Sequence, residues 1–261
     1  MPEAMELAFE ERGSGPVLVF IHGFPFDRTM WIPQLAGLAK IRTCVAVDLR
    51  GHGLSEDRDP GDYSFDLFAD DVAATLDTLK VQEADVCGLS MGGYVAFSMW
   101  RRHRDRVRSL ILIDTKAEAD SDEARAGREA TADLVAKEGM GVLHEKLGPK
   151  LVGGNPSQDV IDRVQAMFTA TSPEIAAADS LAMRDRTDST PDLPTIDVPV
   201  LWLHGEEDQL MPLAGAEASA KEIPGARFVS IPKAGHVASM ENPDAVNDAI
   251  ADFLPAKLPK A

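Results

Sequence analysis

Residues 84–100 read ADVCGLSMGGYVAFSMW, and this stretch decides the fold. Its first part, Ala84–Leu89, is an apolar run that predicts a buried strand, and its later part predicts a helix over Gly93–Arg102. The junction is Gly88-Leu89-Ser90-Met91-Gly92, and a G-x-S-x-G turn between a strand and a helix is typical of a nucleophilic serine. The N-terminus of the helix also directs a positive dipole toward negative charge that develops there. We therefore interpret Ser90 as a nucleophile rather than as an incidental serine in a glycine-rich turn.

The alternation of strand and helix patterns continues on both sides of this stretch. Short apolar, β-branched runs recur, and they are continuous rather than alternating, as expected for strands buried on both faces of a parallel sheet. These runs are Val17–Ile21, Thr43–Val47, Ser109–Ile113, Val198–Leu203 and Ala226–Ile231. Helical patterns lie between them, over Ser64–Leu79 with Ser64 as N-cap, and over Asp244–Leu254. The chain is therefore predicted to form an α/β sheet with βαβ crossovers.

One segment interrupts this alternation. Residues 115–195 contain no strand-like run and predict about four helices, with breaks at Gly139/Gly141, at 153–156 and at Ser172-Pro173. Asn155-Pro156 and Ser172-Pro173 each match an N-cap followed by proline at the first helical position. We expect residues 1–114 and 198–261 to form the core, with 115–197 as a helical cap inserted between two of its strands.

Composition and charge exclude several classes of protein. The 261 residues are 44% hydrophobic and 26% charged, which is the ordinary globular range. The chain has 43 Asp and Glu residues against 26 Lys and Arg residues, which gives a formal net charge of −17 at pH 7. Such a charge disfavours binding to nucleic acids and to membrane surfaces. No run approaches the roughly 18 apolar residues of a membrane span, and the N-terminal residues show no secretion signal. A cytoplasmic protein is expected, and a homo-oligomer remains open.

A serine nucleophile needs a base and an orienting acid. Of the six histidines, His236 is favoured because it follows the last predicted strand in Lys233-Ala234-Gly235-His236. Asp208 follows the strand pattern VPVLWLHG, and the order Ser90, Asp208, His236 matches a serine–acid–histidine triad. Asp114, at the end of SLILID, is the competing acid.

The loop after the run VLVFI is expected to complete the site. An oxyanion hole needs two backbone N–H donors, and the candidates are Met91, next to the nucleophile, and Phe24 in His22-Gly23-Phe24-Pro25. The fixed φ of Pro25 could stiffen this loop. Pro25 and Trp31 are candidate substrate-binding residues, although ordinary core packing explains Trp31 equally well.

Several segments together resemble the α/β-hydrolase superfamily over essentially the whole chain. They are HGFP, DLRGHGLS, GLSMGG, HGEEDQLMP and AGH, at residues 22–25, 48–55, 88–93, 204–212 and 234–236. The resemblance implies a mostly parallel eight-stranded sheet flanked by helices, with a helical cap after strand six. It is strongest to small bacterial carboxylesterases, near aryl esterases, perhydrolases and enol-lactonases. A serine at position 90 argues against the branches that use an aspartate nucleophile, the haloalkane dehalogenases and epoxide hydrolases.

The family's strand order also bears on the two cysteines. It places the strand Val17–Ile21 between those that carry Cys44 and Cys87. Two strand spacings separate them by about 9–10 Å, which is too far for a disulfide. We therefore expect two buried free thiols.

These features predict a serine esterase for a small-molecule ester with a neutral, short acyl group, because no Lys or Arg adjoins the triad in sequence. Five arginines of the helical insertion could turn inward and favour an anionic lactone instead: Arg125, Arg128, Arg163, Arg184 and Arg186. A lactonase or carbon–carbon hydrolase, a cofactor-free perhydrolase or peroxidase, and a ligand-binding receptor remain alternatives. No nucleotide motif and no Cys/His metal spacing occurs, so neither a cofactor nor a metal is expected.

Overall fold

A computed structural model describes residues 3–57, 60–61 and 63–254 of the chain. Within them, seven strands form one sheet in the order β1-β3-β2-β4-β5-β6-β7. The strands are β1 Phe9–Gly13, β2 Val17–Ile21, β3 Thr43–Val47, β4 Ala84–Leu89, β5 Val107–Ile113, β6 Val200–Gly205 and β7 Arg227–Ile231. All neighbouring pairs are parallel except β1 with β3. The mostly parallel α/β sheet is confirmed, but the described part has seven strands rather than eight.

Strand β1 has no counterpart among the predicted apolar runs. Its sequence, FEERG, is mostly exposed because β1 lies at the edge of the sheet and pairs only with β3. Strand β1 therefore buries little apolar surface and lacks the continuous hydrophobic pattern that revealed the other six strands.

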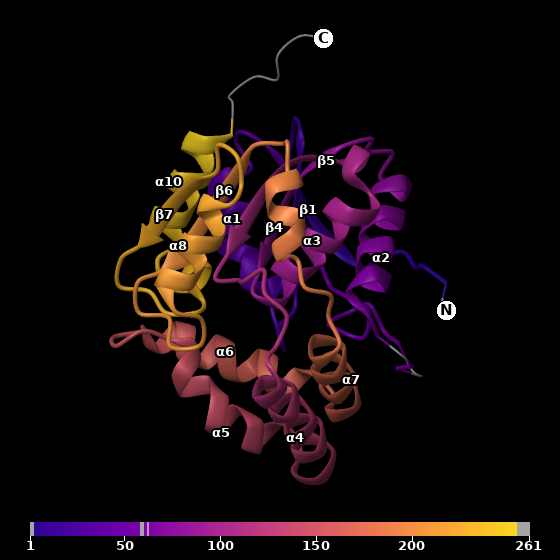
Figure 1. The fold of residues 1–261 in the computed structure, drawn as a ribbon, viewed down its shortest axis with the longest axis vertical. Coiled ribbons are helices and arrows are strands. Elements are labelled where there is room, and N and C mark those ends of the chain that lie inside the picture. Colours follow the sequence, from indigo (N-terminus) through magenta and orange to yellow (C-terminus); the bar gives the residue numbers. More distant parts are fainter. Residues whose placement is uncertain (1–2, 58–59, 62, 255–261) are drawn as a thin grey trace.

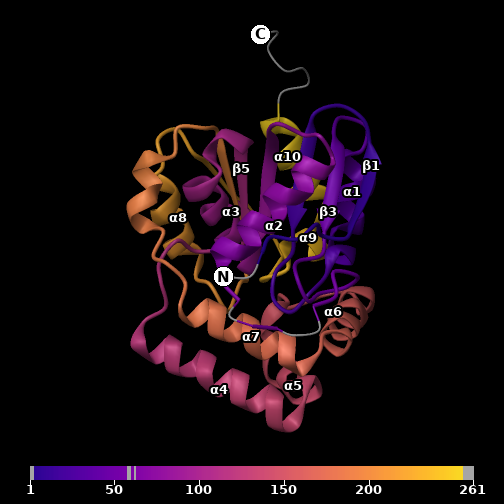
Figure 2. The same cartoon turned by 90° about the vertical axis from the view of Figure 1, so that its right-hand side faces the viewer.

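Helices flank the sheet on both faces (Figures 1 and 2). The α-helices of the core are α1 Ile32–Leu38, α2 Phe65–Thr78, α3 Met91–Arg102, α8 Leu213–Lys221, α9 Ala238–Glu241 and α10 Pro243–Phe253. Short 3-10 helices are η1 Arg28–Trp31, η2 Arg104–Arg106 and η3 Thr190–Thr195. Helix α2 packs on α3, and α1 packs on α10. Ser64 caps α2 as predicted, since its side chain accepts a hydrogen bond from the N–H of Leu67. None of the helices in the described ranges is long and apolar enough to span a membrane.

Four helices form a group of their own below the sheet in Figures 1 and 2. They are α4 Asp122–Glu138, α5 Met140–Leu151, α6 Gln158–Ala170 and α7 Pro173–Arg184, and they connect β5 to β6. The insertion thus follows the fifth described strand rather than the sixth. Its treatment as a separate cap unit over 115–197 stays a prediction, and residues 255–261 of the predicted core segment lie outside the described residues.

One predicted helix start is confirmed and one is wrong. Ser172 caps α7, with its side chain accepting from the N–H of Ile175. The other start was expected at Asn155-Pro156, but α6 begins at Gln158 and its N-cap is Ser157, which accepts from the N–H of Val160. Ser157 is an equally good capping residue that lies closer to the apolar periodic part of the helix, so Pro156 falls before the cap.

The sheet interior holds both cysteines. Cys44 in β3 and Cys87 in β4 are buried free thiols, and β2 lies between their strands. The expected strand order is thus confirmed.

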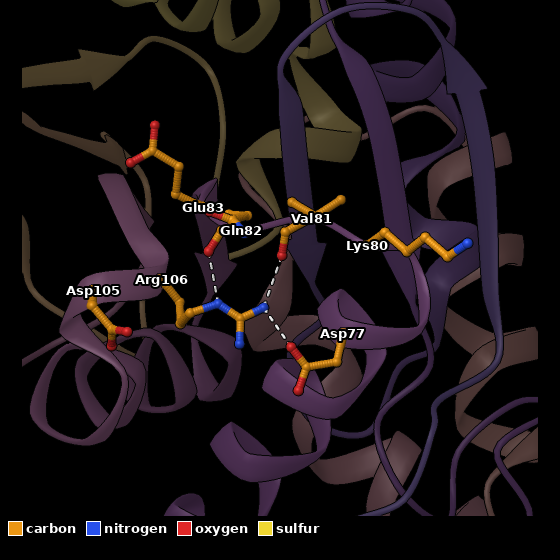
Figure 3. Close-up of a pocket in the computed structure, with 7 residues that line it drawn as sticks. All are labelled: Asp77, Lys80, Val81, Gln82, Glu83, Asp105 and Arg106. Carbon is orange, nitrogen blue, oxygen red and sulfur yellow. Dashed lines mark hydrogen bonds and ion pairs between the residues drawn. The ribbon is translucent and has the colours of Figure 1, made fainter. Parts of the chain in front are cut away.

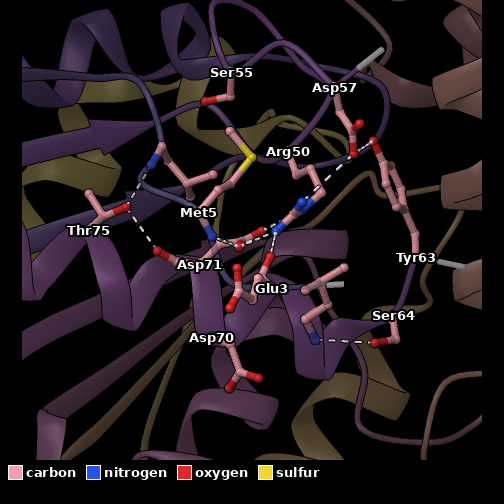
Figure 4. Close-up of polar contacts among 12 residues, drawn as sticks. Glu3, Met5, Arg50, Ser55, Asp57, Tyr63, Ser64, Asp70, Asp71 and Thr75 are labelled. Atoms are coloured by element: carbon pink, nitrogen blue, oxygen red, sulfur yellow. Dashed lines mark hydrogen bonds and ion pairs between the residues drawn. The ribbon is translucent and has the colours of Figure 1, made fainter. Parts of the chain in front are cut away.

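A buried polar network fixes the segment before β1 against the loop that follows β3 (Figure 4). The Arg50 guanidinium binds the Asp71 carboxylate at 2.6 Å and donates to the carbonyl of Glu3. Asp71 also accepts from the N–H of Met5, and Thr75 accepts from the N–H of Leu7. These bonds hold the loop from 48 to 55 in place at the same end of the sheet as the candidate site.

Candidate active site

Ser90 occupies a sharp turn between β4 and α3. Its backbone lies in the positive-φ region, at φ 53° and ψ −113°, which a residue with a side chain rarely adopts. The turn is held because the N–H of Ser90 donates to Ile113 O at 2.9 Å and the Thr115 hydroxyl donates to Ser90 O at 2.8 Å. A Cβ at Gly92 would lie 2.2 Å from the carbonyl oxygen of Ile21, so only glycine fits there. The motif therefore presents the Ser90 side chain at the carboxyl end of β4.

Ser90, His236 and Asp208 form one continuous hydrogen-bonded chain. Ser90 Oγ lies 2.8 Å from His236 Nε2, and His236 Nδ1 lies 2.8 Å from Asp208 Oδ2. The three side chains come from the ends of β4, β7 and β6, which meet at one edge because these strands are parallel. With Nδ1–H donating to Asp208, Nε2 is free to accept the Ser90 hydroxyl proton. The arrangement can thus activate a serine for attack on a carbonyl.

The environment of Asp208 keeps its carboxylate ionised. Burial alone raises the pKa of Asp208, but His236 and the N–H groups of Met211 and Leu210 outweigh burial and lower that pKa below its ordinary value. Asp208 Oδ1 accepts from Leu210 N at 2.8 Å and Met211 N at 3.0 Å, which leaves Oδ2 directed at His236. A fixed anion at this place orients the imidazole and stabilises its protonated form.

Asp114, the competing acid, makes no hydrogen bond with His236 among the described residues. Its Oδ1 accepts from the N–H of Gly205 at 2.7 Å, and its Oδ2 accepts from the N–H of Ala238 at 3.1 Å. Gly205 ends the strand before Asp208, and Ala238 follows His236 by two residues. Asp114 thus ties together the two loops that carry the other members of the chain. Burial, and next the charge of Asp208, raise the pKa of Asp114 well above its ordinary value.

The other strand-end histidines, His22 and His204, hold loops by hydrogen bonds. His22 Nδ1 lies 2.9 Å from Gly23 O, and its Nε2 accepts from the N–H of Leu49. His204 Nε2 lies 2.7 Å from Met211 O. One atom each of Asp114, His204 and Asp208 that could bind a metal ion lies within 4.8 Å of the other two. Both carboxylates there already accept hydrogen bonds from backbone N–H groups, so the geometry describes a hydrogen-bond network that supports the triad.

A cavity of about 170 Å³ opens beside Ser90 and His236. Its other lining residues are Phe24, Tyr94, Lys116, Arg128, Leu147, Leu151, Met183, Leu210 and Met211. They come from both the core and the helical insertion. Tyr94 could have been suspected from sequence, because it lies one helical turn after Ser90. Leu147, Leu151 and Met183 carried no such signal.

The structure separates the residues expected around the oxyanion loop. Phe24 lines the cavity, and the N–H groups of Phe24 and Met91 have no protein acceptor within the described ranges. Pro25 follows a cis peptide bond and lies outside the cavity lining, with its carbonyl accepting from the Thr171 hydroxyl. Trp31 is not among the residues that line the cavity; it is fully buried, with its ring centroid 5.0 Å from that of Phe20. Its position at the end of η1 turns it into the core.

The cavity carries positive charge, although no Lys or Arg adjoins Ser90, Asp208 or His236 in sequence. Lys116 and Arg128 both line it, although neither lies near the triad in sequence. Of the other arginines of the insertion that could turn inward, Arg186 is buried outside the cavity lining and forms an ion pair with Asp120. Arg163 donates to Thr29 O, and Arg125 and Arg184 pair with Asp185 at the surface.

A larger hollow of about 690 Å³ lies at the opposite end of the sheet (Figure 3). It is lined by residues that precede β4 and β5, among them Glu83, Asp105 and Arg106. Arg106 crosses it to bind Asp77 and the carbonyls of Val81 and Gln82. Open, charged and at the amino ends of the strands, it lacks the features of a ligand site in an α/β sheet.

Comparisons with known proteins identify the family of the fold. A family model described as the alpha/beta hydrolase fold matches residues 16–243. A thermophilic esterase from Thermogutta terrifontis, solved with malate bound, has a TM-score of 0.92 and 41% identity, over 95% of this chain and 92% of that one. The enol-lactonase from Burkholderia xenovorans LB400 has a TM-score of 0.86 and is 31% identical in sequence, over 95% of this chain and 95% of that one. An AB hydrolase superfamily protein, YisY of Bacillus subtilis, is 32% identical in sequence, over 96% of this chain and 96% of that protein.

Proposed function

The chain belongs to the alpha/beta hydrolase family, and from that premise we propose that it is a serine hydrolase that cleaves small carboxylic esters through an acyl-enzyme. The observation that carries the proposal is the unbroken chain from Ser90 Oγ to His236 to Asp208, at 2.8 Å in both links. A receptor would need only a pocket, whereas this alignment of nucleophile, base and anion is useful for chemistry.

The proposed reaction has two halves. In the first, His236 Nε2 takes the Ser90 proton while Oγ attacks the ester carbonyl, and the protonated imidazole then gives its proton to the leaving alcohol. In the second, His236 activates a water that attacks the acyl-serine and releases the acid. The N–H groups of Phe24 and Met91 are proposed to hold the negative oxygen that forms in each half. Asp208 keeps the imidazole oriented throughout.

The cavity supports a small substrate. Its volume of about 170 Å³ is below the roughly 300–1,000 Å³ of sites for drug-sized ligands. Apolar walls from Leu147, Leu151 and Met183 close it on the side of the helical insertion. We expect short acyl groups to be preferred over long lipid chains.

Lactone opening is the second candidate. It uses the same attack and the same oxyanion, but the leaving alcohol stays attached to the acyl group. The 31% identity to an enol-lactonase favours this over the perhydrolase, peroxidase and carbon–carbon hydrolase alternatives.

The test is a pre-steady-state assay with 4-nitrophenyl acetate. A burst of one nitrophenolate per active site is expected, together with a protein mass increase equal to one acetyl group. Neither should occur in the Ser90→Ala variant, and the folded content of that variant is checked by circular dichroism. A burst and mass gain that persist without the Ser90 hydroxyl would exclude the proposed nucleophile.

A further inference from the structure

One wall of the cavity beside Ser90 is cationic, because Lys116 and Arg128 line it. Lys116 directly follows Thr115, whose hydroxyl is bonded to the carbonyl of Ser90, so its position is fixed relative to the nucleophile. Arg128 comes from α4 of the helical insertion and faces the same cavity. No Asp or Glu is among the described residues that line it. A substrate in this cavity therefore meets positive charge on one side.

One buried carboxylate positions both cations. Asp120 accepts from Lys116 Nζ at 3.0 Å and from Arg128 Nε at 3.0 Å, and it also binds Arg186 at 2.8 Å. Burial raises the pKa of Asp120, but Arg128 and Arg186 outweigh this and lower it to about 2, so Asp120 stays ionised. The single negative charge of Asp120 is thus shared among three positively charged side chains. The remaining guanidinium N–H groups of Arg128 make no hydrogen bond within the described residues.

The neighbouring carboxylates are directed elsewhere. Glu118 accepts from the Ser219 hydroxyl on α8, and Asp188 accepts from the N–H of Thr190. Neither lines the cavity. The positive charge of Arg128 and Lys116 is therefore neutralised only in part from the protein side.

Tyr94 gives an independent indication of a ligand site. It lines the cavity, is 4% exposed, and its hydroxyl has no hydrogen-bond partner in the described part of the chain. Its ring stacks under Arg186, whose Cζ lies 4.3 Å from the ring centroid. Burial raises the pKa of Tyr94 against the opposing effect of Arg186, so the hydroxyl remains a proton donor. A buried donor without an acceptor is costly unless a ligand supplies one.

We propose that Arg128, Lys116 and Tyr94 form a subsite for a carboxylate carried by the substrate. The inference rests on the proposed function and adds a substrate class to it: small esters or lactones with a carboxylate near the scissile bond. The carboxylate accepts from the free N–H groups of Arg128, from Lys116 Nζ and from the Tyr94 hydroxyl. Its charge balances the two lining cations, and the acceptor that Tyr94 lacks is supplied.

The experiment compares esters that differ only in this group. On the acyl side, the mono-4-nitrophenyl ester of succinate is compared with 4-nitrophenyl levulinate, in which an acetyl group replaces the carboxylate. On the alcohol side, O-acetylglycolate is compared with acetonyl acetate. Wild-type kcat/KM is expected to favour the anionic member by at least about 10-fold in one of the two pairs, as for a hydrogen-bonded charge.

Variants then test which residues provide the preference. Arg128→Gln should reduce the anionic-to-neutral ratio about 10- to 100-fold, and Tyr94→Phe should reduce it less. Arg128→Lys should restore part of it. The matched control is Arg125→Gln, on the same helix but at the surface on Asp185, which should leave both activity and ratio unchanged.

The outcomes separate this inference from the proposed function. Neutral esters hydrolysed as well as anionic ones in both pairs would overturn the carboxylate subsite and leave the esterase standing. If wild type hydrolyses no ester, the proposed function fails, and calorimetry with succinate on Ser90→Ala still decides the subsite. Succinate should bind that variant and lose at least about 10-fold in affinity when Arg128→Gln is added. Absence of succinate binding would then overturn the inference.

Discussion

The core and the helical insertion contribute to the cavity in different ways. The core supplies Ser90, Asp208 and His236, each from a loop at the end of a parallel strand, with positions fixed by backbone hydrogen bonds. The insertion supplies Arg128 from α4 and Met183 from α7, two helices that pack on each other. We therefore propose that the reaction chemistry lies on the rigid sheet, and that substrate selection lies on helices that can change without disturbing it.

The largest effect is expected when the proposed nucleophile of the core is removed. Ser90→Ala should lower kcat for ester hydrolysis by about 10⁴- to 10⁶-fold, because the residues of the triad act as one unit. For the same reason Ser90→Ala combined with His236→Ala should cost no more than either change alone. Steady-state kinetics on purified variants measure both. Losses that simply multiply would show that the two residues act independently.

The difference between core and insertion also explains what the sequence could predict. Ser90, Asp208 and His236 were recognisable because parallel strands bring their carboxyl ends to one edge, so chain order and loop position carry spatial information. Arg128 was not, because its approach depends on how helix α4 docks, which the strand order does not determine, and Lys116 lies in the loop that leads from β5 to that helix. Trp31 packs in the core although it lies close in sequence to the oxyanion loop, because that closeness does not determine which way a side chain points. Strand β1 lacked an apolar pattern because it lies at the exposed edge.

Within the core, the two acids should differ in effect. Asp208→Asn should lower kcat by about 10³- to 10⁴-fold, because the amide favours the wrong imidazole tautomer. Asp114→Asn removes one of two backbone hydrogen bonds and should cost only about 10-fold through loop positioning, as expected for one lost buried hydrogen bond. Parallel kinetics with one ester measure the difference. A larger loss in Asp114→Asn would mean that Asp208 is not the orienting acid.

On the insertion side, Met183→Ala should change selectivity rather than chemistry. The shorter side chain enlarges the cavity, so kcat/KM for a hexanoyl ester should rise relative to an acetyl ester by about 10-fold, the scale of one methylene in an apolar pocket. Leu181→Ala on the same helix is the control, because Leu181 is 37% exposed and lies outside the cavity lining. A chain-length series of 4-nitrophenyl esters measures the ratio. An unchanged profile would place the acyl group elsewhere.

The smallest expected effect concerns a buried link between the two regions. His52, in the loop after β3, has its Nε2 2.7 Å from Oδ2 of Asp179 on α7, and both side chains are fully buried. Burial lowers the pKa of His52, but the charge and hydrogen bond of Asp179, with a further contribution from Asp48, outweigh it and raise the pKa above the ordinary value. A histidine whose pKa is raised by folding stabilises the protein fully below its unfolded value of about 6.5, and that stabilisation is lost as pH rises through the folded pKa.

The free energy of unfolding should therefore differ most between wild type and His52→Gln near pH 6, and less near pH 9. Each unit by which folding raises the pKa contributes about 1.4 kcal/mol to that difference. Urea denaturation of both proteins across this range measures it, and taking the difference cancels groups that titrate equally in the two. In an Asp179→Asn background, the pH dependence of the His52→Gln penalty should be lost or reversed in sign, because the carboxylate that outweighs the effect of burial on the pKa of His52 is gone. A penalty for His52→Gln that stays constant or grows from pH 6 to pH 9 would mean that the link between core and insertion is a neutral hydrogen bond rather than an ion pair.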